Sequence, residues 1–410
     1  MTTSNRAIRR ASIFLLLAGG LAVPGMVLRL TGFSDSQGVE AALYGIAILG
    51  AAFLLGAAAE LAELEISASL ALALVALIAI LPEYAVDMVF AWKAADDPSY
   101  AQYAAANMTG GNRLLIGIGW PAVILIFWWK RSRKPLNLDP GNRLELTFLL
   151  LATGWAFTIF LRSLFRDGSL NIVDSIVLVG LFVVYLVIGS KGPRKDDPHL
   201  VGPMAPFAAL SRPARRALLG GLFIVSALVI VASAEPFAEG LVEVGLKLGI
   251  DEFVLVQWVA PLASEAPEIA VAVMFAVRGQ GALAMGVLIS SKVNQWTLLV
   301  GTLPLVYSIS AGSVSELPLD TRQADEFLLT AAQSLFAVLL LAAMRVSWRG
   351  GLALLVLFLS QLFFTDTLVR MIFSMIYIGL SLGILMWDRE RREGTKTLLA
   401  GAVRWMAPAR

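Results

Sequence analysis

The sequence predicts an all-α polytopic membrane protein. Hydrophobic residues make up 58% of the chain and charged residues only 15%, and the mean hydropathy is +0.78. This composition favours solvation by lipid over solvation by water. A helix needs about 20 apolar residues to cross a bilayer, because each residue advances about 1.5 Å. We therefore predict about twelve transmembrane helices, over residues 11–31, 41–62, 67–92, 101–129, 145–164, 171–190, 215–242, 252–277, 281–309, 325–344, 350–364 and 367–387.

The positions of the basic residues predict the orientation. Most of the 32 lysines and arginines lie in segments that share one side of the membrane when both termini are placed in the cytoplasm. These segments include 130–143, 191–216 and the tail that begins at Asp388. We expect an integral protein of a bacterial inner membrane with both termini cytoplasmic. The polar stretch 191–213 is expected to be a cytoplasmic linker, because it is too short to bury a core.

Composition and motifs argue against several functions. The chain has no cysteine, so disulfides, thiolate metal sites and cysteine nucleophiles are excluded. Its net charge of +2 provides no concentrated basic face for a nucleic acid. The sequence contains no phosphate-binding Walker motif and none of the common hydrolase signatures. We therefore expect no enzymatic activity and no cofactor, with the lipid bilayer and small cations as partners.

Two stretches place charge inside segments that are otherwise apolar enough for the bilayer. The first runs from Ile80 to Leu115 and the second from Leu262 to Thr297. Each is expected to contain an apolar helix broken at a Pro-Glu pair, a short polar turn, and a second helix interrupted by small and amide residues. A charge at membrane depth is costly, so each stretch is a candidate functional site. Corresponding breaks in two halves of a chain are typical of a transporter's binding site.

The two stretches belong to a longer internal repeat. The sequence LLGAAAELAEL at 54–64 resembles IVASAEPFAEGL at 230–241, and each precedes its Pro-Glu pair by one helix. A five-helix unit therefore recurs, with one extra helix at each end of the chain. In the predicted topology the two units are inverted with respect to the membrane, which is typical of secondary transporters. The expected divisions are 1–40, 41–190, 191–213, 214–364 and 365–410.

These motifs resemble the two α-repeats of the cation/calcium exchanger superfamily. The resemblance rests on the Pro-Glu pairs at 82–83 and 267–268, and on the small-residue elements at 106–115 and 286–295. It covers both five-helix units. It implies a sodium/calcium exchanger-like fold and a cation antiporter whose central glutamates bind the transported ion.

The sequence also departs from the pattern of that superfamily. Ile-Ala-Ile at 78–80 replaces Gly-Thr-Ser, while Gly111 and Leu115 replace a hydroxyl and an amide residue. Lys292 stands where the second repeat should carry the counterpart of Asn112. Several oxygen ligands that the resemblance implies for Ca²⁺ are therefore missing.

The carboxylates of the two Pro-Glu pairs, Glu83 and Glu268, are the expected metal ligands, because hard cations prefer carboxylate oxygens. Asp87 lies one helical turn after Glu83, and Glu265 lies three residues before Glu268, so each pair shares a helical face. The candidate ion-binding residues are Glu83, Asp87, Asn107, Asn112, Ser264, Glu265, Glu268, Ser291, Lys292 and Gln295.

Lys292 distinguishes between the candidate ions. An ammonium beside the glutamates acts as a tethered monovalent cation, which disfavours a divalent ion, and a buried lysine can also carry a proton. We therefore predict a secondary active antiporter that exchanges Na⁺ or Ca²⁺ against H⁺ or Na⁺ by alternating access. In one alternative, Lys292 and Arg113 only neutralise buried acids as ion pairs. In another, the chain is a degenerate exchanger with a sensor or scaffold role and no ion turnover.

Overall fold

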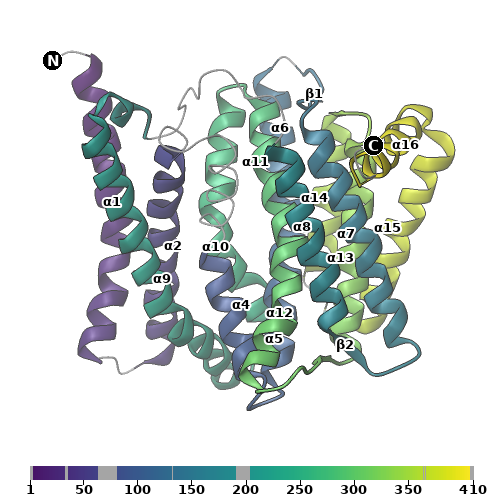
Figure 1. Cartoon of the computed structure of the whole chain (residues 1–410), viewed down its shortest axis with the longest axis horizontal. Helices are drawn as coiled ribbons and strands as arrows, with labels where there is room; N and C mark the ends of the chain where they lie inside the picture. The colour runs from purple at the N-terminus through teal and green to yellow at the C-terminus, as the bar shows by residue number, and fades with distance from the viewer. Residues whose placement is uncertain are drawn as a thin grey trace. The chain divides into compact units, whose positions relative to one another are not determined.

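The computed structural model describes residues 3–32, 36–62, 81–131, 133–190, 204–362, 364 and 366–406. The first part of the expected span 67–92, the sequence at 78–80 and most of the expected linker 191–213 lie outside these residues. The described part is almost entirely helical, and it confirms the all-α polytopic fold (Figure 1).

The helical elements carry labels in chain order, and strands are labelled separately. The helices are α1 (Thr3–Thr31), α2 (Gln37–Ala62), α4 (Leu81–Lys93), α5 (Tyr100–Leu114), the π-helix η1 (Leu115–Gly119), α6 (Trp120–Lys130), α7 (Asn142–Ser163), α8 (Ile172–Ser190), the 3₁₀-helix η2 (Ala205–Ala209), α9 (Arg212–Leu248), α10 (Glu252–Val277), α11 (Gly281–Asn294), the π-helix η3 (Gln295–Leu299), α12 (Val300–Ser310), α13 (Thr321–Leu341), α14 (Trp348–Leu362), α15 (Thr367–Trp387) and α16 (Arg389–Met406).

Nine helices within the described residues are long and apolar enough to cross a membrane. α10 and α15 have the bounds that the sequence predicts, whereas α13 begins at Thr321, earlier than expected. The expected span 350–364 is the shorter helix α14, of 15 residues. The expected span 281–309 consists of α11, η3 and α12 in direct succession.

The helices belong to two compact units. The first contains Met1–Val89 and Leu186–Pro267, and the second contains Phe90–Tyr185 and Glu268–Arg410. Each unit therefore combines segments from both halves of the chain, and the divisions fall inside α4, α8 and α10. Helices pack through complementary faces, so a packing unit need not follow the order of the repeats.

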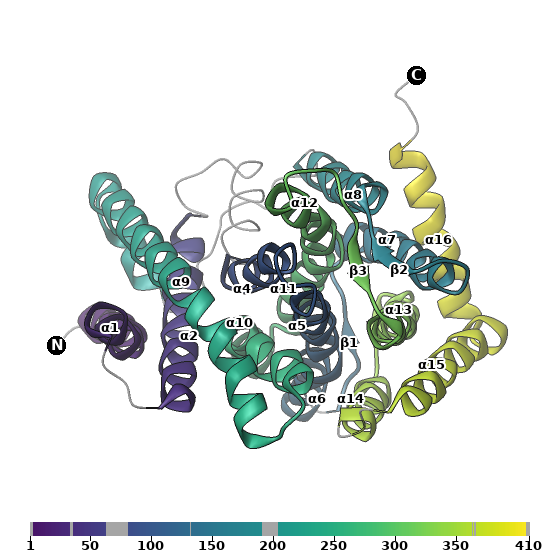
Figure 2. The ribbon, with the colours of Figure 1, turned by 90° about the horizontal axis from the view of Figure 1, so that it is seen from below.

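Small residues hold α1, α2 and α9 side by side in the first unit (Figures 1 and 2). A Cβ added at Gly50 of α2 would lie 2.5 Å from the carbonyl oxygen of Ala18 in α1. A Cβ added at Gly240 of α9 would lie 2.9 Å from the Cβ of Ala41 in α2. Glycine at both positions thus allows the backbones to approach closely, as is common between membrane helices.

Helix α13 is the most completely buried of the nine spans: in its apolar 18-residue stretch, 94% of the residues are buried inside the protein. It begins with a capping box: the Asp320 carboxylate accepts the N–H of Gln323, and the Gln323 side chain accepts the N–H of Asp320. Helices α5, α7 and α15 pack around α13 in the second unit (Figure 2). This central position makes α13 the scaffold against which the other helices of the unit are placed.

Two short antiparallel ribbons, which the sequence did not predict, join loops of the second unit. β1 (Leu136–Asn137) pairs with β4 (Arg345–Val346), and β2 (Gly168–Leu170) pairs with β3 (Leu317–Leu319). In the predicted topology, β1 and β4 lie in cytoplasmic loops, whereas β2 and β3 lie in outer loops. Each ribbon therefore joins two loops that were expected on the same side of the membrane.

Candidate functional site

Helix α4 carries the acidic candidates Glu83 and Asp87 in the first unit. Both side chains are buried, at 3% and 0% exposure. They are separated by one helical turn and so share a face, as the sequence predicts. The Tyr84 hydroxyl lies within electrostatic reach of both carboxylates. The structure thus keeps two carboxylates together within an apolar helix.

Helix α10 carries Ser264 and Glu265 in its first-unit part, and both are buried. The Ser264 hydroxyl donates to the carbonyl oxygens of Ala260 and Pro261, at 3.3 and 3.2 Å. The predicted break at the second Pro-Glu pair is wrong, because α10 continues through Pro267 to Val277. Pro267 removes one N–H donor from the helix ladder, and the remaining helical bonds on either side sustain the helix.

In the second unit, Lys292 of α11 bonds to Asn112 of α5. The fully buried Lys292 Nζ donates to the Asn112 side-chain oxygen at 2.6 Å and to the Asn112 carbonyl oxygen at 3.2 Å. The Asn112 Nδ2 donates to the carbonyl oxygen of Met108 at 2.8 Å, which turns Oδ1 toward the ammonium. The ammonium also lies 4.6 Å from the centre of the Trp296 ring. Two oxygens and an aromatic face therefore hold a positive charge at this point.

A π-helix follows each of these two residues at the same distance. η1 starts three residues after Asn112, and η3 starts three residues after Lys292. The predicted interruption of the second helix of each stretch is therefore a change of helical register, with no gap in the helix. π-Helical segments are rare, and they occur preferentially at functional sites. Their matching positions identify Asn112 and Lys292 as counterparts in the two repeats.

The remaining candidates of the second unit lie on the same helices or on α10. The Ser291 hydroxyl of α11 lies beside the Glu268 carboxylate of α10. Asn107 of α5 and Gln295, the first residue of η3, are 1% and 0% exposed. The second unit thus brings together Glu268 with Ser291, and Asn112 with Lys292. Glu83, Asp87, Ser264 and Glu265 are all placed in the first unit.

Sequence reasoning missed a buried charge cluster in the second unit. Arg113 of α5 donates to the Glu326 carboxylate of α13, and Arg370 Nε of α15 lies 2.7 Å from the other oxygen of Glu326. Arg113 is thus part of an ion pair, as one alternative predicted, and its partner lies outside the candidate set. Arg370 lies near the start of the expected span 367–387 and is 4% exposed. The sequence signal was Glu326 in an apolar helix. The predicted span began at residue 325, which placed Glu326 at the end of the helix, whereas α13 begins at Thr321.

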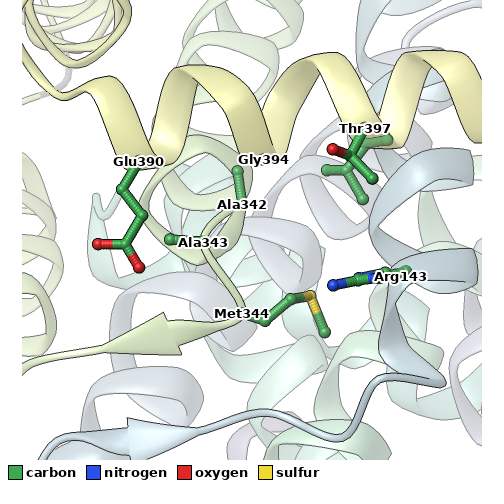
Figure 3. Close-up of a pocket in the computed structure, with 8 residues that line it drawn as sticks. Arg143, Ala342, Ala343, Met344, Glu390, Gly394 and Thr397 are labelled. Carbon is green, nitrogen blue, oxygen red and sulfur yellow. The ribbon is translucent and has the colours of Figure 1, made fainter.

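A cavity of about 140 Å³ lies away from these residues, where α16 crosses the end of α13 (Figure 3). Arg143 and Met344 point toward one another on one side, and Glu390 lies on α16 farther along. A Cβ added at Gly394 would collide with the carbonyl oxygen of Ala342, so glycine permits this crossing. The cavity contains none of the candidate ion-binding residues.

Among the described residues, no group of three or more histidine, cysteine, aspartate or glutamate side chains has the geometry of a metal site. The site chemistry consists instead of buried carboxylates, hydroxyls, amide oxygens and one ammonium carried on membrane-spanning helices. Buried ionisable groups facing the interior of a helical bundle are typical of secondary transporters. The fold and the site thus define an integral membrane protein of the transporter class.

Comparison with known proteins gives the family. The family model of the sodium/calcium exchanger proteins matches residues 39–190 and 218–365. The chain belongs to this family, which confirms the resemblance to the cation/calcium exchanger superfamily.

Two solved structures and one curated protein are similar to this chain. The crystal structure of the H⁺/Ca²⁺ exchanger CAX is 45% identical, has a TM-score of 0.88, and matches over 95% of this chain and 98% of its own. The structure of the Ca²⁺/H⁺ antiporter protein YfkE shares the fold, with 17% identity, a TM-score of 0.62, and coverage of 90% and 100%. CaxA of Alkalimonas amylolytica, an antiporter by its name, is 24% identical over 255 residues, or 61% of this chain and 73% of its own.

Proposed function

We propose that the protein is a secondary active antiporter that exchanges Na⁺ or Ca²⁺ against H⁺ by alternating access at a mid-membrane carboxylate site. The observation that carries this proposal is the bonding of Lys292. A positive group lies within the apolar interior, held by both oxygens of Asn112 and by the Trp296 ring. Oxygens and aromatic faces of this kind also bind metal cations.

The buried carboxylates supply the coupling in this proposal. A carboxylate in a low-dielectric site is ionised only when a positive charge compensates it. Glu268 lies beside Ser291, so a bound cation and a proton would compete for the same oxygen set. Glu83 and Asp87 provide two further carboxylates on α4. Competition of cation and proton for one site is the minimal requirement for exchange, and it needs neither a cofactor nor covalent chemistry.

The relatives support a proton-coupled reaction. The similar structure with 45% identity is described as an H⁺/Ca²⁺ exchanger. Each strand pair joins two loops that the predicted topology assigns to the same side of the membrane as one another. We therefore extend the proposal to an orientation with both termini in the cytoplasm, within a bacterial inner membrane.

The test is a flux assay in vesicles that contain only this protein and an internal pH dye. Gradients of Na⁺, K⁺ and Ca²⁺ are imposed in turn, and isotope uptake is followed in parallel. We expect a Na⁺ or Ca²⁺ gradient to move protons in the opposite direction, and Glu268→Gln to reduce the rate at least about 100-fold. Glu252→Gln, near the start of the same helix, is the matched control and should retain the wild-type rate.

Each result has a definite meaning. Undiminished flux in Glu268→Gln would remove that residue from the ion path. Cation uptake without proton movement would show that the exchanged counter-ion is not the proton. If folded protein shows no ion flux with any of the three cations, the result would instead support a degenerate exchanger with a sensor or scaffold role.

A further inference from the structure

The charge cluster of Arg113, Glu326 and Arg370 adjoins the Lys292 site through the chain itself. Arg113 directly follows Asn112 on α5. Each oxygen of Glu326 pairs with a different arginine, so one carboxylate joins α5, α13 and α15. The three side chains are almost completely inaccessible to solvent. A displacement of α5 at Arg113 would therefore also displace the partner of Lys292.

The main chain at this point is held by two further side chains. Gln333 Nε2 of α13 donates to the Arg113 carbonyl oxygen at 3.3 Å. Lys292 Nζ of α11 donates to the preceding carbonyl oxygen, that of Asn112. Both carbonyls lie just before η1, where the helix changes from its usual hydrogen-bond pattern to the wider π pattern. Such a change leaves carbonyl oxygens at the junction able to accept side-chain donors.

Glu326 and Gln333 are two helical turns apart and lie on one face of α13. The central scaffold helix therefore contacts Arg113 twice, once through its side chain and once through its carbonyl oxygen. Arg370 reinforces the first of these contacts from α15, a helix that begins after the matched repeats end at residue 365. Removing Arg370 would leave Glu326 with less compensation for its buried charge.

We propose that Arg113, Glu326 and Arg370 are positioning residues for the ion site. They fix the main chain of Asn112 and Arg113, so that both oxygens of Asn112 face the Lys292 ammonium. The helix α15 thereby acts on the ion site although it lies outside the repeats. The consequence for transport rests on the proposed function, whereas the positioning of α5 does not.

The experiment compares Arg370→Met with the matched control Arg162→Met, which breaks the Arg162–Asp174 ion pair between α7 and α8 of the same unit. Gln333→Met is a second test variant that changes no charge and removes the contact to the Arg113 carbonyl. Hydrogen exchange in lipid nanodiscs reports on the amides of residues 112–119. The KM and maximal rate for the driving cation are measured in vesicles.

We expect exchange over 112–119 to accelerate at least about tenfold in Arg370→Met and in Gln333→Met, and to be unchanged in Arg162→Met. The KM should rise at least about fivefold in both test variants. Arg370→Lys, which retains the charge, should restore part of both effects. Unchanged exchange over 112–119 in folded Arg370→Met and Gln333→Met, or the same acceleration in Arg162→Met, would overturn the inference. Absence of ion flux in the wild-type protein would overturn the proposed function. The hydrogen-exchange data would still decide whether the three residues position α5.

Discussion

The Lys292 ammonium donates hydrogen bonds to both the side-chain oxygen and the carbonyl oxygen of Asn112. Lys292 and Asn112 occupy equivalent positions in the two repeats. The pair places a positive group where the first repeat offers oxygens for a cation. Within the apolar interior such a group repels a further cation strongly, since charges at 4 Å interact by about 4 kcal/mol at an effective dielectric constant of about 20. The charge of Lys292 should therefore determine which ion the site accepts.

Lys292→Asn tests this relationship directly. The variant removes the charge and adds an amide oxygen, so the preference for Ca²⁺ over Na⁺ should rise at least about tenfold. Proton movement driven by Na⁺ should be abolished. Competition between the two ions in the vesicle assay measures the preference, with Lys292→Arg as the variant that retains the charge. An unchanged preference in Lys292→Asn would show that the ammonium is structural.

Gly117 lies in the π-helix η1, where it faces a buried aromatic ring. A Cβ added there would collide with the Phe358 ring of α14. Gly117→Ala should therefore destabilise the protein by about 1–3 kcal/mol, the usual cost of overpacking. The apparent melting temperature in detergent reports this effect. The control is Gly154→Ala on α7, where an added Cβ meets no atom within 4 Å; equal melting temperatures for the two variants would contradict the packing argument.

Glu60 lies near the end of α2, two residues before Ala62. In the first unit its carboxylate oxygens accept the main-chain N–H of Met204, at 3.2 and 3.1 Å. Glu60→Ala should lower stability by about 1–3 kcal/mol, because a hydrogen bond to a charged acceptor is lost. The KM for the driving cation should remain that of the wild type. A large rise in KM, absent from Glu40→Ala on the same helix, would place Glu60 in the ion path.

Asp388 connects α15 to α16 outside the membrane-spanning segments. Burial raises the pKa of the Asp388 carboxyl, but the N–H and the guanidinium of Arg391 outweigh burial and hold the pKa below its ordinary value. A lowered pKa means that the stabilisation is complete above the ordinary value, near 4, and is lost as the pH falls through the folded-state value. The contribution should be below about 1 kcal/mol, since the pair is partly exposed.

Asp388→Asn should accordingly melt at a lower temperature than the wild type at pH 6 to 7. The difference should shrink as the pH falls below about 4 and vanish in strong acid. Melting curves of both proteins across this range measure the effect. A difference that persists undiminished at low pH would mean that the carboxylate charge is not its source.

Several features of the fold were predictable from local sequence. The bounds of α10 and α15 follow from predominantly apolar runs that end at polar segments, and the structure has these bounds. The burial of Glu83, Asp87 and Lys292 was predictable as well, because each lies in a segment that only a membrane would solvate. Apolar length and the cost of exposed charge are properties of a segment, so they can be read without its neighbours.

Other features depended on residues far apart in the chain. Sequence reasoning expected breaks at Pro267 and in the second helix of each stretch, but α10 continues and the other two become π-helices. A proline costs a helix one hydrogen bond, and packing decides whether the helix breaks, bends or continues. The strand pairs of two or three residues could not be predicted from the sequence either, because such short pairs are stable only where the helices bring their loops together.

By itself, the sequence determined that the chain is an integral membrane helix bundle with charge at membrane depth and a repeated Pro-Glu motif. Only the tertiary structure decided which groups compensate those charges. Arg113 and Glu326 are 213 residues apart, and Lys292 and Asn112 are 180 residues apart. Burial makes compensation obligatory, but helix packing selects the partner, and that selection is not encoded in any single segment.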